Sequence, residues 1–168
     1  MAGRIGNTFA ELKSKQMKAF IPFIMAGDPD IETTIQLVVA LDKAGSHVIE
    51  LGIPFSDPVA DGPTIQRAGY RALRHGYGFS DYLQAVKEIR KQSEAPLLMF
   101  SYYNPIYSYG VDALARDARA AGVDGFLVTD MIPEESDEYC ASMKENELDC
   151  VFLAAPTSSE ERIARIAA

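Results

Sequence analysis

The sequence has no basic run, few cysteines and no long apolar segment, and each of these absences excludes a class of protein. It contains 16 Lys and Arg against 24 Asp and Glu, a formal net charge of −8. Without clustered Lys and Arg it has no surface for a phosphate backbone, so we expect no nucleic-acid partner. Cys140 and Cys150 lie outside any CxxC pair, which favours reduced thiols over a structural disulfide.

The apolar residues are scattered in short runs. No segment approaches the ~20 consecutive apolar residues of a membrane span, and residues 1–16 lack the apolar core of a signal peptide. We therefore expect a cytoplasmic protein that makes no membrane contact. With 48% hydrophobic and 24% charged residues, the composition is typical of one soluble globular domain.

The apolar runs alternate with segments of helical period, a pattern that indicates successive strand–helix units in a parallel sheet. The predicted strands are 20–25, 48–51, 96–102, 125–128 and 150–153. The predicted helices between them are 31–44, 65–75, 79–93 with Ser80 as N-cap, a helix of about a dozen residues ending before Gly122, and 135–146. The stretch NPIYSYG (104–110) is predicted to be a loop.

A last helix is expected to begin at a capping box in residues 158–161. It reaches Ala168 without a Gly, Asn or Pro to end it, so the chain looks cut short. Five parallel strands fit either a complete flavodoxin-like open sheet or an incomplete barrel of eight, and the count alone favours the open sheet. The turn after the first strand, AGDPD, lacks the GxGxxG and Walker A spacings, which weakens the open sheet without excluding it.

The most informative stretch is HVIELGIPFSDPVADGPT, residues 47–64. It places Glu50 on an apolar strand near its carboxyl end, where barrel enzymes carry their active sites. Burial of a carboxyl group is costly unless the group is partnered or used, and it raises the pKa toward the range useful for proton transfer. Three prolines in the following loop restrict the backbone that carries Asp57 and Asp61.

Other roles for these residues stay open on residue chemistry alone. A site of carboxylates would suit a hard cation, but neither histidine is placed to assist, and we assign no metal site. A Schiff-base aldolase needs a lysine at a strand's carboxyl end, whereas Lys18 precedes the first strand. Glu50 is about as often a salt-bridge partner as a catalytic group. Asp57 and Asp61 are more often turn residues.

Four segments carry a resemblance to one family. The stretch ELGIPFSDPVADGPTIQ (50–66) is very similar to the signature of the tryptophan synthase alpha subunit family. The segments that resemble the same family in the same order are AFIPFIMAGDPD (19–30), LLMFSYYNPIYSYG (97–110) and AGVDGFLVTDMIPEES (121–136). The resemblance implies an α/β fold, a (β/α)8 TIM barrel that is incomplete here: a single domain over 1–168, from the first strand to the fifth helix and truncated before strands 6–8.

The resemblance also implies an activity and site residues. The family is a lyase of tryptophan biosynthesis that splits indole-3-glycerol phosphate into indole and glyceraldehyde 3-phosphate by retro-aldol cleavage. Glu50 matches its proton-shuttling acid/base, and Asp61 matches the aspartate that accepts the indole N–H and stabilises cationic indole. Phe23 and residues 98–102 match strands of the indole pocket, with Tyr102 near its mouth.

The partner and the cofactor follow from the same resemblance. Asp57, Pro58 and Asn104 match loops that meet a beta subunit in an alpha-beta-beta-alpha heterotetramer. That subunit holds pyridoxal phosphate, so this chain is expected to carry no cofactor. Because the family's phosphate-binding loops follow later strands, we expect weak or no activity from the chain alone. The alternatives are another phosphosugar TIM-barrel lyase or isomerase, and a non-catalytic partner that modulates the beta subunit.

One loop departs from the family pattern. Residues 130–133 read Asp-Met-Ile-Pro, where the family usually has Asp-Leu-Pro-Pro-Glu-Glu or Asp-Val-Pro. We therefore expect a different local geometry after the fourth strand.

Overall fold

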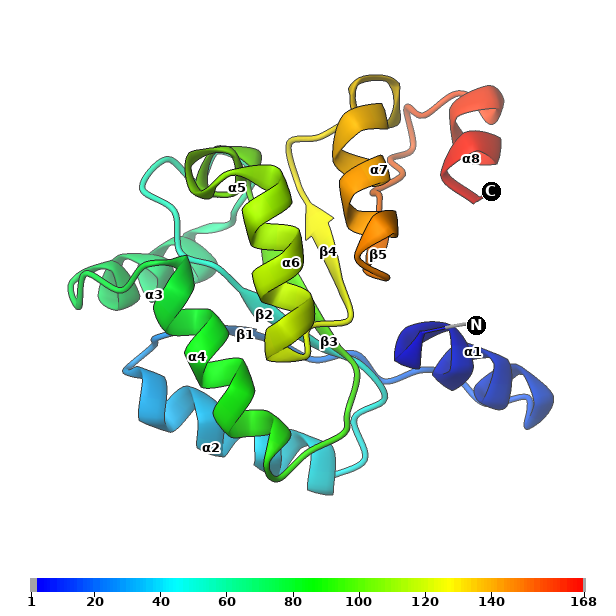
Figure 1. Cartoon of the computed structure of the whole chain (residues 1–168). Coiled ribbons are helices and arrows are strands. Elements are labelled where there is room, and N and C mark those ends of the chain that lie inside the picture. Colours follow the sequence, from blue (N-terminus) through cyan, green and yellow to red (C-terminus); the bar gives the residue numbers. More distant parts are fainter. Residues whose placement is uncertain (1–2, 168) are drawn as a thin grey trace.

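The computed structural model describes residues 3–167. In this range five strands form one parallel sheet in the order β1-β2-β3-β4-β5 (Figure 1). The strands are β1 Phe23–Met25, β2 Ile49–Gly52, β3 Leu97–Ser101, β4 Gly125–Val128 and β5 Asp149–Val151. Each strand pairs with its neighbour in sequence, which is the order of a barrel wall. The flavodoxin-like alternative is wrong, because a doubly wound sheet reverses its strand order.

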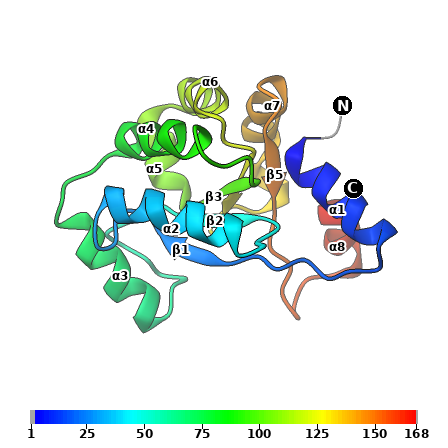
Figure 2. The same ribbon diagram turned by 90° about the horizontal axis from the view of Figure 1, so that it is seen from below.

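Four helices cover the outer face of this sheet, and the other helices lie elsewhere around it. The helices are α1 Arg4–Ser14, α2 Ile31–Lys43, α3 Pro63–Leu73, α4 Phe79–Arg90, α5 Tyr103–Tyr109, α6 Val111–Ala121, α7 Asp137–Glu145 and α8 Glu160–Ala167, with a 3-10 turn at Pro133–Glu135. Helices α2, α4, α6 and α7 contact one another in that order along one face (Figures 1 and 2). No helix in residues 3–167 is long and apolar enough to span a membrane. The expected helix end at Ala168 lies outside the described residues.

Several helix ends follow from local sequence. Helix α2 begins because the carboxylate of Asp30 accepts a hydrogen bond from the Thr33 N–H at 2.7 Å, which satisfies a free N–H of the first turn. Helix α6 ends at Gly122, which adopts φ 99° in the left-handed region that glycine enters without strain. Both ends agree with the prediction from sequence.

Other local predictions were wrong. Helix α4 starts at Phe79 as predicted, but its N-cap is Gly78 and not Ser80, because the carboxylate of Asp81 accepts from the Gly78 N–H at 2.8 Å. Residues 104–110 are mostly helical: α5 accepts Pro105 in its first turn, where no intrahelical N–H is needed. The last helix, by contrast, begins within the predicted residues 158–161, and Ser159 acts as its N-cap by accepting from the Arg162 N–H at 3.2 Å.

The two faces of the sheet differ in what they bury. The helix-facing strand residues, each at most 3% exposed, are Ile49, Leu51, Leu97, Met99, Phe126 and Val128. Alternation along the strands turns a second set toward the inner face, where Val48, Leu98 and Leu127 form a smaller cluster with Ile5 of α1 packed against it. The helix-facing side is therefore the main core, and α1 covers part of the inner face.

A close contact on the inner face requires a glycine. The ring of Phe23 lies over Gly52, so that a Cβ at position 52 would overlap the ring. The same ring meets Phe100 edge-on, with centroids 5.3 Å apart. The glycine that follows Glu50 and Leu51 therefore makes room for an aromatic pair beside the strand end.

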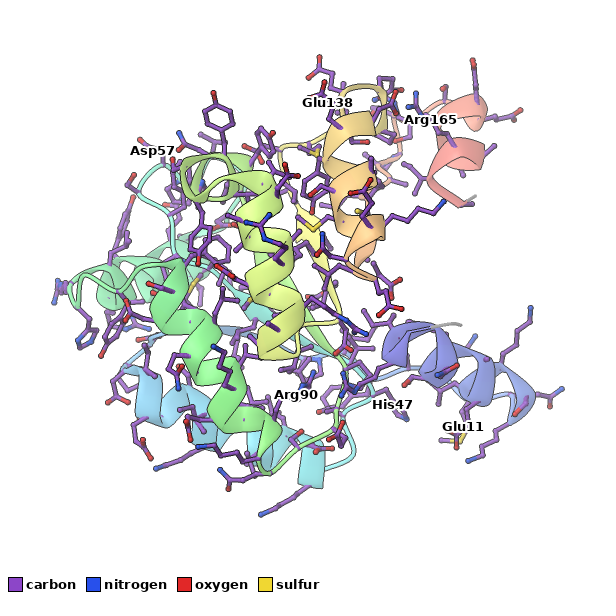
Figure 3. All side chains as sticks on the ribbon, viewed as in Figure 1. Glu11, His47, Asp57, Arg90, Glu138 and Arg165 are labelled. Carbon is purple, nitrogen blue, oxygen red and sulfur yellow. The ribbon has the colours of Figure 1, made fainter. Side chains whose placement is uncertain are left out.

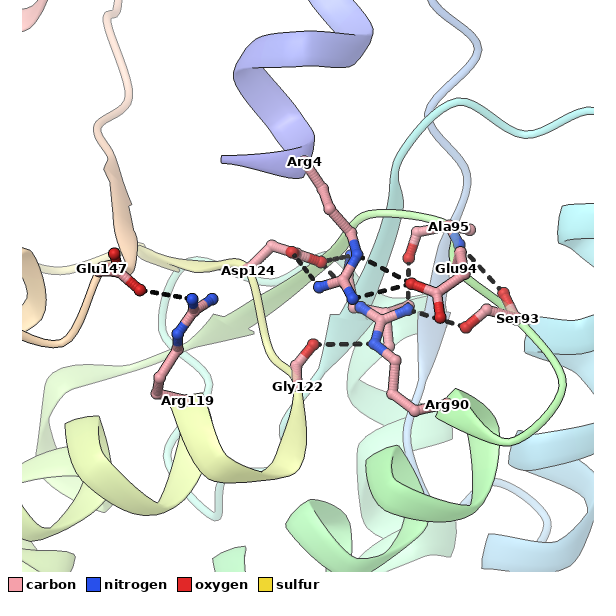
Figure 4. A network of polar contacts seen from close by, with 10 residues as sticks. Arg4, Arg90, Ser93, Glu94, Ala95, Arg119, Gly122, Asp124 and Glu147 are labelled. Carbon is pink, nitrogen blue, oxygen red and sulfur yellow. Dashed lines mark hydrogen bonds and ion pairs between the residues drawn. The ribbon is translucent and has the colours of Figure 1, made fainter. Parts of the chain in front are cut away.

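At the amino end of the sheet, the carboxylate of Asp124 holds three segments together (Figure 4). It accepts from Arg4 of α1 at 3.1 Å, from Arg90 of α4 at 2.8 Å and from the Leu97 N–H of β3 at 2.8 Å. The Asp124 side chain is 3% exposed and that of Arg90 is 11% exposed. Burial lowers the pKa of Arg90, and the Asp124 charge opposes that shift. The pair is thus a buried ion pair whose groups are also hydrogen-bonded.

Candidate active site at the carboxyl edge of the sheet

Glu50 lies on the inner face near the carboxyl end of β2. It is in register with Phe23 on β1 and Leu98 on β3, and it is half-buried. Burial raises the pKa of its carboxyl group above the usual 4.5. Among residues 3–167 no side chain or N–H donates a hydrogen bond to this carboxylate, so nothing offsets the cost of charging it. A carboxyl group in that state is suited to giving and taking a proton.

Asp61 lies in the loop between β2 and α3 and is also half-buried. Burial raises the pKa of its carboxyl group, while a hydrogen bond from the Tyr102 hydroxyl acts in the opposite direction. The loop backbone is held by the Gln66 side-chain amide, which donates to the Asp61 carbonyl oxygen at 2.9 Å. The two candidate catalytic carboxyls therefore differ, because the Tyr102 hydroxyl lowers the pKa of Asp61, whereas no donor acts on Glu50 from residues 3–167.

Tyr102 follows β3 and is buried, with 4% exposure. Its hydroxyl oxygen accepts from the Ala60 N–H at 2.9 Å. Its ring packs against Phe55 with centroids 5.2 Å apart. Tyr102 thus contacts the loop that carries Asp61 through both its hydroxyl group and its ring.

The residues expected at a partner surface lie on the outside of this edge. Asp57 is exposed and accepts from the Ser56 hydroxyl at 2.6 Å, and Figure 3 shows it at the end of the molecule away from Arg90 and His47. Pro58 is half-buried and Asn104 is exposed in the first turn of α5. The neighbouring Val59 is 87% exposed, an apolar side chain at the tip of the same loop.

The structure joins some predicted site residues directly. Phe23 neighbours Glu50, and the Tyr102 hydroxyl lies close enough to Asp61 to lower the pKa of its carboxyl group. Phe100 was not singled out, although it lies within the 98–102 segment and packs on Phe23. Strand alternation could have found it, because Phe100 is two residues beyond the inward-facing Leu98.

Two further features of the edge concern loops and ions. After β4, Asp130 accepts from the Tyr103 N–H at 2.7 Å, which ties the loop to the start of α5 and leaves residues 131–132 before a 3-10 turn. In the part of the chain that is described, no three His, Cys, Asp or Glu side chains are grouped to hold a metal ion. The groups that meet at this edge are carboxyl groups beside aromatic rings.

Comparisons with known proteins agree on one family. A family model described as tryptophan synthase alpha chain matches residues 9–168. A protein of that description from Geotalea daltonii is 50% identical over 165 residues, which is 98% of this chain and 62% of the relative. The chain thus spans about 62% of the length of the curated relatives it matches.

Solved structures give the same result. Tryptophan synthase subunit alpha from Legionella pneumophila superposes with a TM-score of 0.95 and 43% identity, covering 99% of this chain and 64% of that one. A structure described as the tryptophan synthase α2β2 complex of Pyrococcus furiosus gives 0.84 and 44% identity, covering 88% of this chain and 63% of that one. The five strand–helix units therefore have the fold of part of a (β/α)8 barrel.

Proposed function

The chain belongs to the tryptophan synthase alpha chain family, and on that premise we propose that it supplies the acid/base groups of a lyase that splits indole-3-glycerol phosphate. The products are indole and glyceraldehyde 3-phosphate. The observation that carries the proposal is the pair of half-buried carboxyls, Glu50 and Asp61, whose pKa values burial raises at the carboxyl edge of the sheet. We further propose that residues 1–168 belong to a single barrel domain.

Glu50 moves the protons in this proposal. Its protonated carboxyl gives a proton to indole C3, and the carboxylate then takes the proton of the glycerol hydroxyl next to the breaking C–C bond. That bond breaks as the hydroxyl-bearing carbon becomes the aldehyde carbon, so the carboxyl group ends the cycle protonated as it began. Burial without a fixed hydrogen-bond donor supports this role, because it brings the pKa closer to neutrality.

Asp61 stays ionised in this proposal. It accepts the indole N–H and stabilises the positive charge that develops when C3 is protonated. The hydrogen bond from Tyr102 supports this role, because it stabilises the charged form of the carboxyl group against the effect of burial. Phe23 and Tyr102 are proposed to line the indole site, and Phe23 has an aromatic neighbour there in Phe100.

The partner in this proposal is a tryptophan synthase beta subunit, bound in an alpha-beta-beta-alpha heterotetramer through Asp57, Pro58 and Asn104. The support is the exposed loop tip around Val59 and the α2β2 description of the Pyrococcus furiosus relative. The chain itself would hold no cofactor, and pyridoxal phosphate would belong to the beta subunit. Mixing the chain with a beta subunit while following serine turnover tests the contact, and an unchanged rate over a full titration would contradict it.

Cleavage of indole-3-glycerol phosphate tests the reaction. The chain should be assayed alone and joined to the part of the Geotalea daltonii relative that it does not match, with weak or no turnover alone and turnover in the joined protein. In the joined protein, Glu50→Gln and Asp61→Asn should each lower kcat by at least about 100-fold. The exposed Glu138 of α7 is the control, since Glu138→Gln should leave kcat unchanged. Full activity of Glu50→Gln would contradict the proposal.

A further inference from the structure

The hydroxyl group of Tyr102 has a defined set of partners. The Ala60 N–H points at its oxygen from 2.9 Å, so the phenol acts there as the acceptor. A tyrosine hydroxyl has one proton to donate, and that proton remains free for a second bond. Asp61 follows Ala60 in the same loop, and its carboxyl group lies close enough to the hydroxyl for each group to shift the pKa of the other. An ionised carboxylate only accepts, so it is a suitable acceptor for the free phenol proton.

The same hydroxyl joins different segments of the fold. Ala60 and Asp61 belong to the loop after β2, whereas Tyr102 follows β3. The ring is fixed by its burial and by Phe55. A buried side chain whose ring and hydroxyl group both contact the loop of a neighbouring strand is rigid enough to orient what it bonds.

We propose that Tyr102 is a positioning residue, which anchors the loop after β2 through the Ala60 N–H and holds the Asp61 carboxylate in place through its hydroxyl. Its role in turnover is therefore exerted through Asp61 and not through contact with the reacting atoms. The effect on turnover rests on the proposed function, whereas the hydrogen bonds themselves do not.

The surroundings of Asp61 make this bond measurable. Among residues 3–167, Tyr102 is the titratable group that acts on the Asp61 carboxyl, and the other influence is burial. On the α3 side the Gln66 amide is neutral and bonds the Asp61 carbonyl oxygen. Loss of the phenol proton donor therefore leaves burial unopposed, and the pKa of Asp61 moves up.

Nuclear magnetic resonance on the isotopically labelled chain tests the bonds without turnover. In Tyr102→Phe, which keeps the ring, the titration of the Asp61 carboxyl carbon should move to higher pH, and exchange of the Ala60 amide proton should become faster. The control is Tyr109→Phe, because Tyr109 donates to the carboxylate of Asp117 at 2.7 Å elsewhere on the surface. That control should leave Asp61 and Ala60 unchanged. A folded Tyr102→Phe chain with both signals unchanged would overturn the inference.

A double-mutant cycle in the joined protein separates positioning from substrate contact. Tyr102→Phe should lower kcat about tenfold, the effect of losing one hydrogen bond to a charged group, with little change in KM. In the Asp61→Asn background the same substitution should change kcat less than about twofold. An equal tenfold loss in both backgrounds would contradict action through Asp61. An active Asp61→Asn protein would instead contradict the proposed function, and the resonance titration would still decide the hydrogen bonds.

Discussion

At the amino end of the sheet a buried carboxylate is neutralised, whereas at the carboxyl end two half-buried carboxyls are not. Asp124 meets two guanidinium groups and a backbone N–H (Figure 4). Glu50 has no donor among residues 3–167, and Asp61 has the neutral phenol of Tyr102. Acidic side chains thus serve two purposes in this molecule. The ion pairs of Asp124 at the amino end stabilise the fold. At the carboxyl end, burial makes the charged form of Glu50 less favourable, which suits proton transfer.

The largest effect expected from breaking this contrast is at the amino end. Asp124→Ala leaves the buried guanidinium of Arg90 without its charge partner and should lower the free energy of unfolding by about 3–5 kcal/mol. Urea denaturation measures it. Glu147→Ala is the matched control, because it breaks only the exposed ion pair with Arg119 and should cost less than about 1 kcal/mol. Equal losses in the two variants would remove the contrast.

A smaller loss of stability is expected when a side chain is added at Gly52, at the carboxyl end of the sheet. Gly52→Ala places a methyl group against the ring of Phe23 and should cost about 1–3 kcal/mol in urea denaturation. Gly69→Ala is the control, since its Cβ would meet Met25 at an ordinary 3.7 Å, and alanine is the better helix former. Gly69→Ala should therefore be neutral or stabilising. If Gly52→Ala were equally well tolerated, the ring would not be fixed over the glycine.

The smallest change in stability is expected from removing the charge of Glu50 at the carboxyl end. Burial raises the folded-state pKa of Glu50 above 4.5, so its stabilising contribution is present below the unfolded pKa and is lost as pH rises through the folded one. Glu50→Gln should therefore melt at a higher temperature than the parent at pH 7, and this difference should shrink as pH falls below about 4.5. Thermal melts across that range measure it.

The same thermal melts on an Asp30 variant should give the opposite dependence on pH. The Thr33 N–H lowers the pKa of its carboxyl group, so the contribution of Asp30 is present above its unfolded pKa and is lost as pH falls through the folded one. Asp30→Asn keeps a good N-cap. Its melting temperature should therefore fall furthest below that of the parent at neutral pH. The same pH trend in both variants would contradict the assignment of the two environments.

The parts of the fold that depend on local signals could be predicted from sequence. Strand β4 and the end of α6 at Gly122 were predicted at or within a residue of their bounds, because each rests on a short pattern. Helix α5 was missed because its first N–H bonds the carboxylate of Asp130, 27 residues further along. Helix α1 was not predicted, and it is held by the ion pairs of Arg4 with Glu94 and Asp124.

The same division applies to the site. Strand alternation and the loop prolines predict that Glu50 and Asp61 lie near one strand end. The bond of Tyr102 to Ala60 joins residues 42 apart, and no local pattern encodes it. The raised pKa values likewise depend on burial that only the folded sheet creates.

The most direct measurement of the central claim is the titration of the Glu50 carboxyl carbon in the folded chain, with Glu50→Gln used to identify its resonance. The account predicts a midpoint above the ordinary 4.5, because the group is half-buried and residues 3–167 offer it no hydrogen-bond donor. A midpoint at or below 4.5 would mean that a charged or hydrogen-bonding partner neutralises Glu50, as the arginines neutralise Asp124, and would contradict its role as the proton-transferring group.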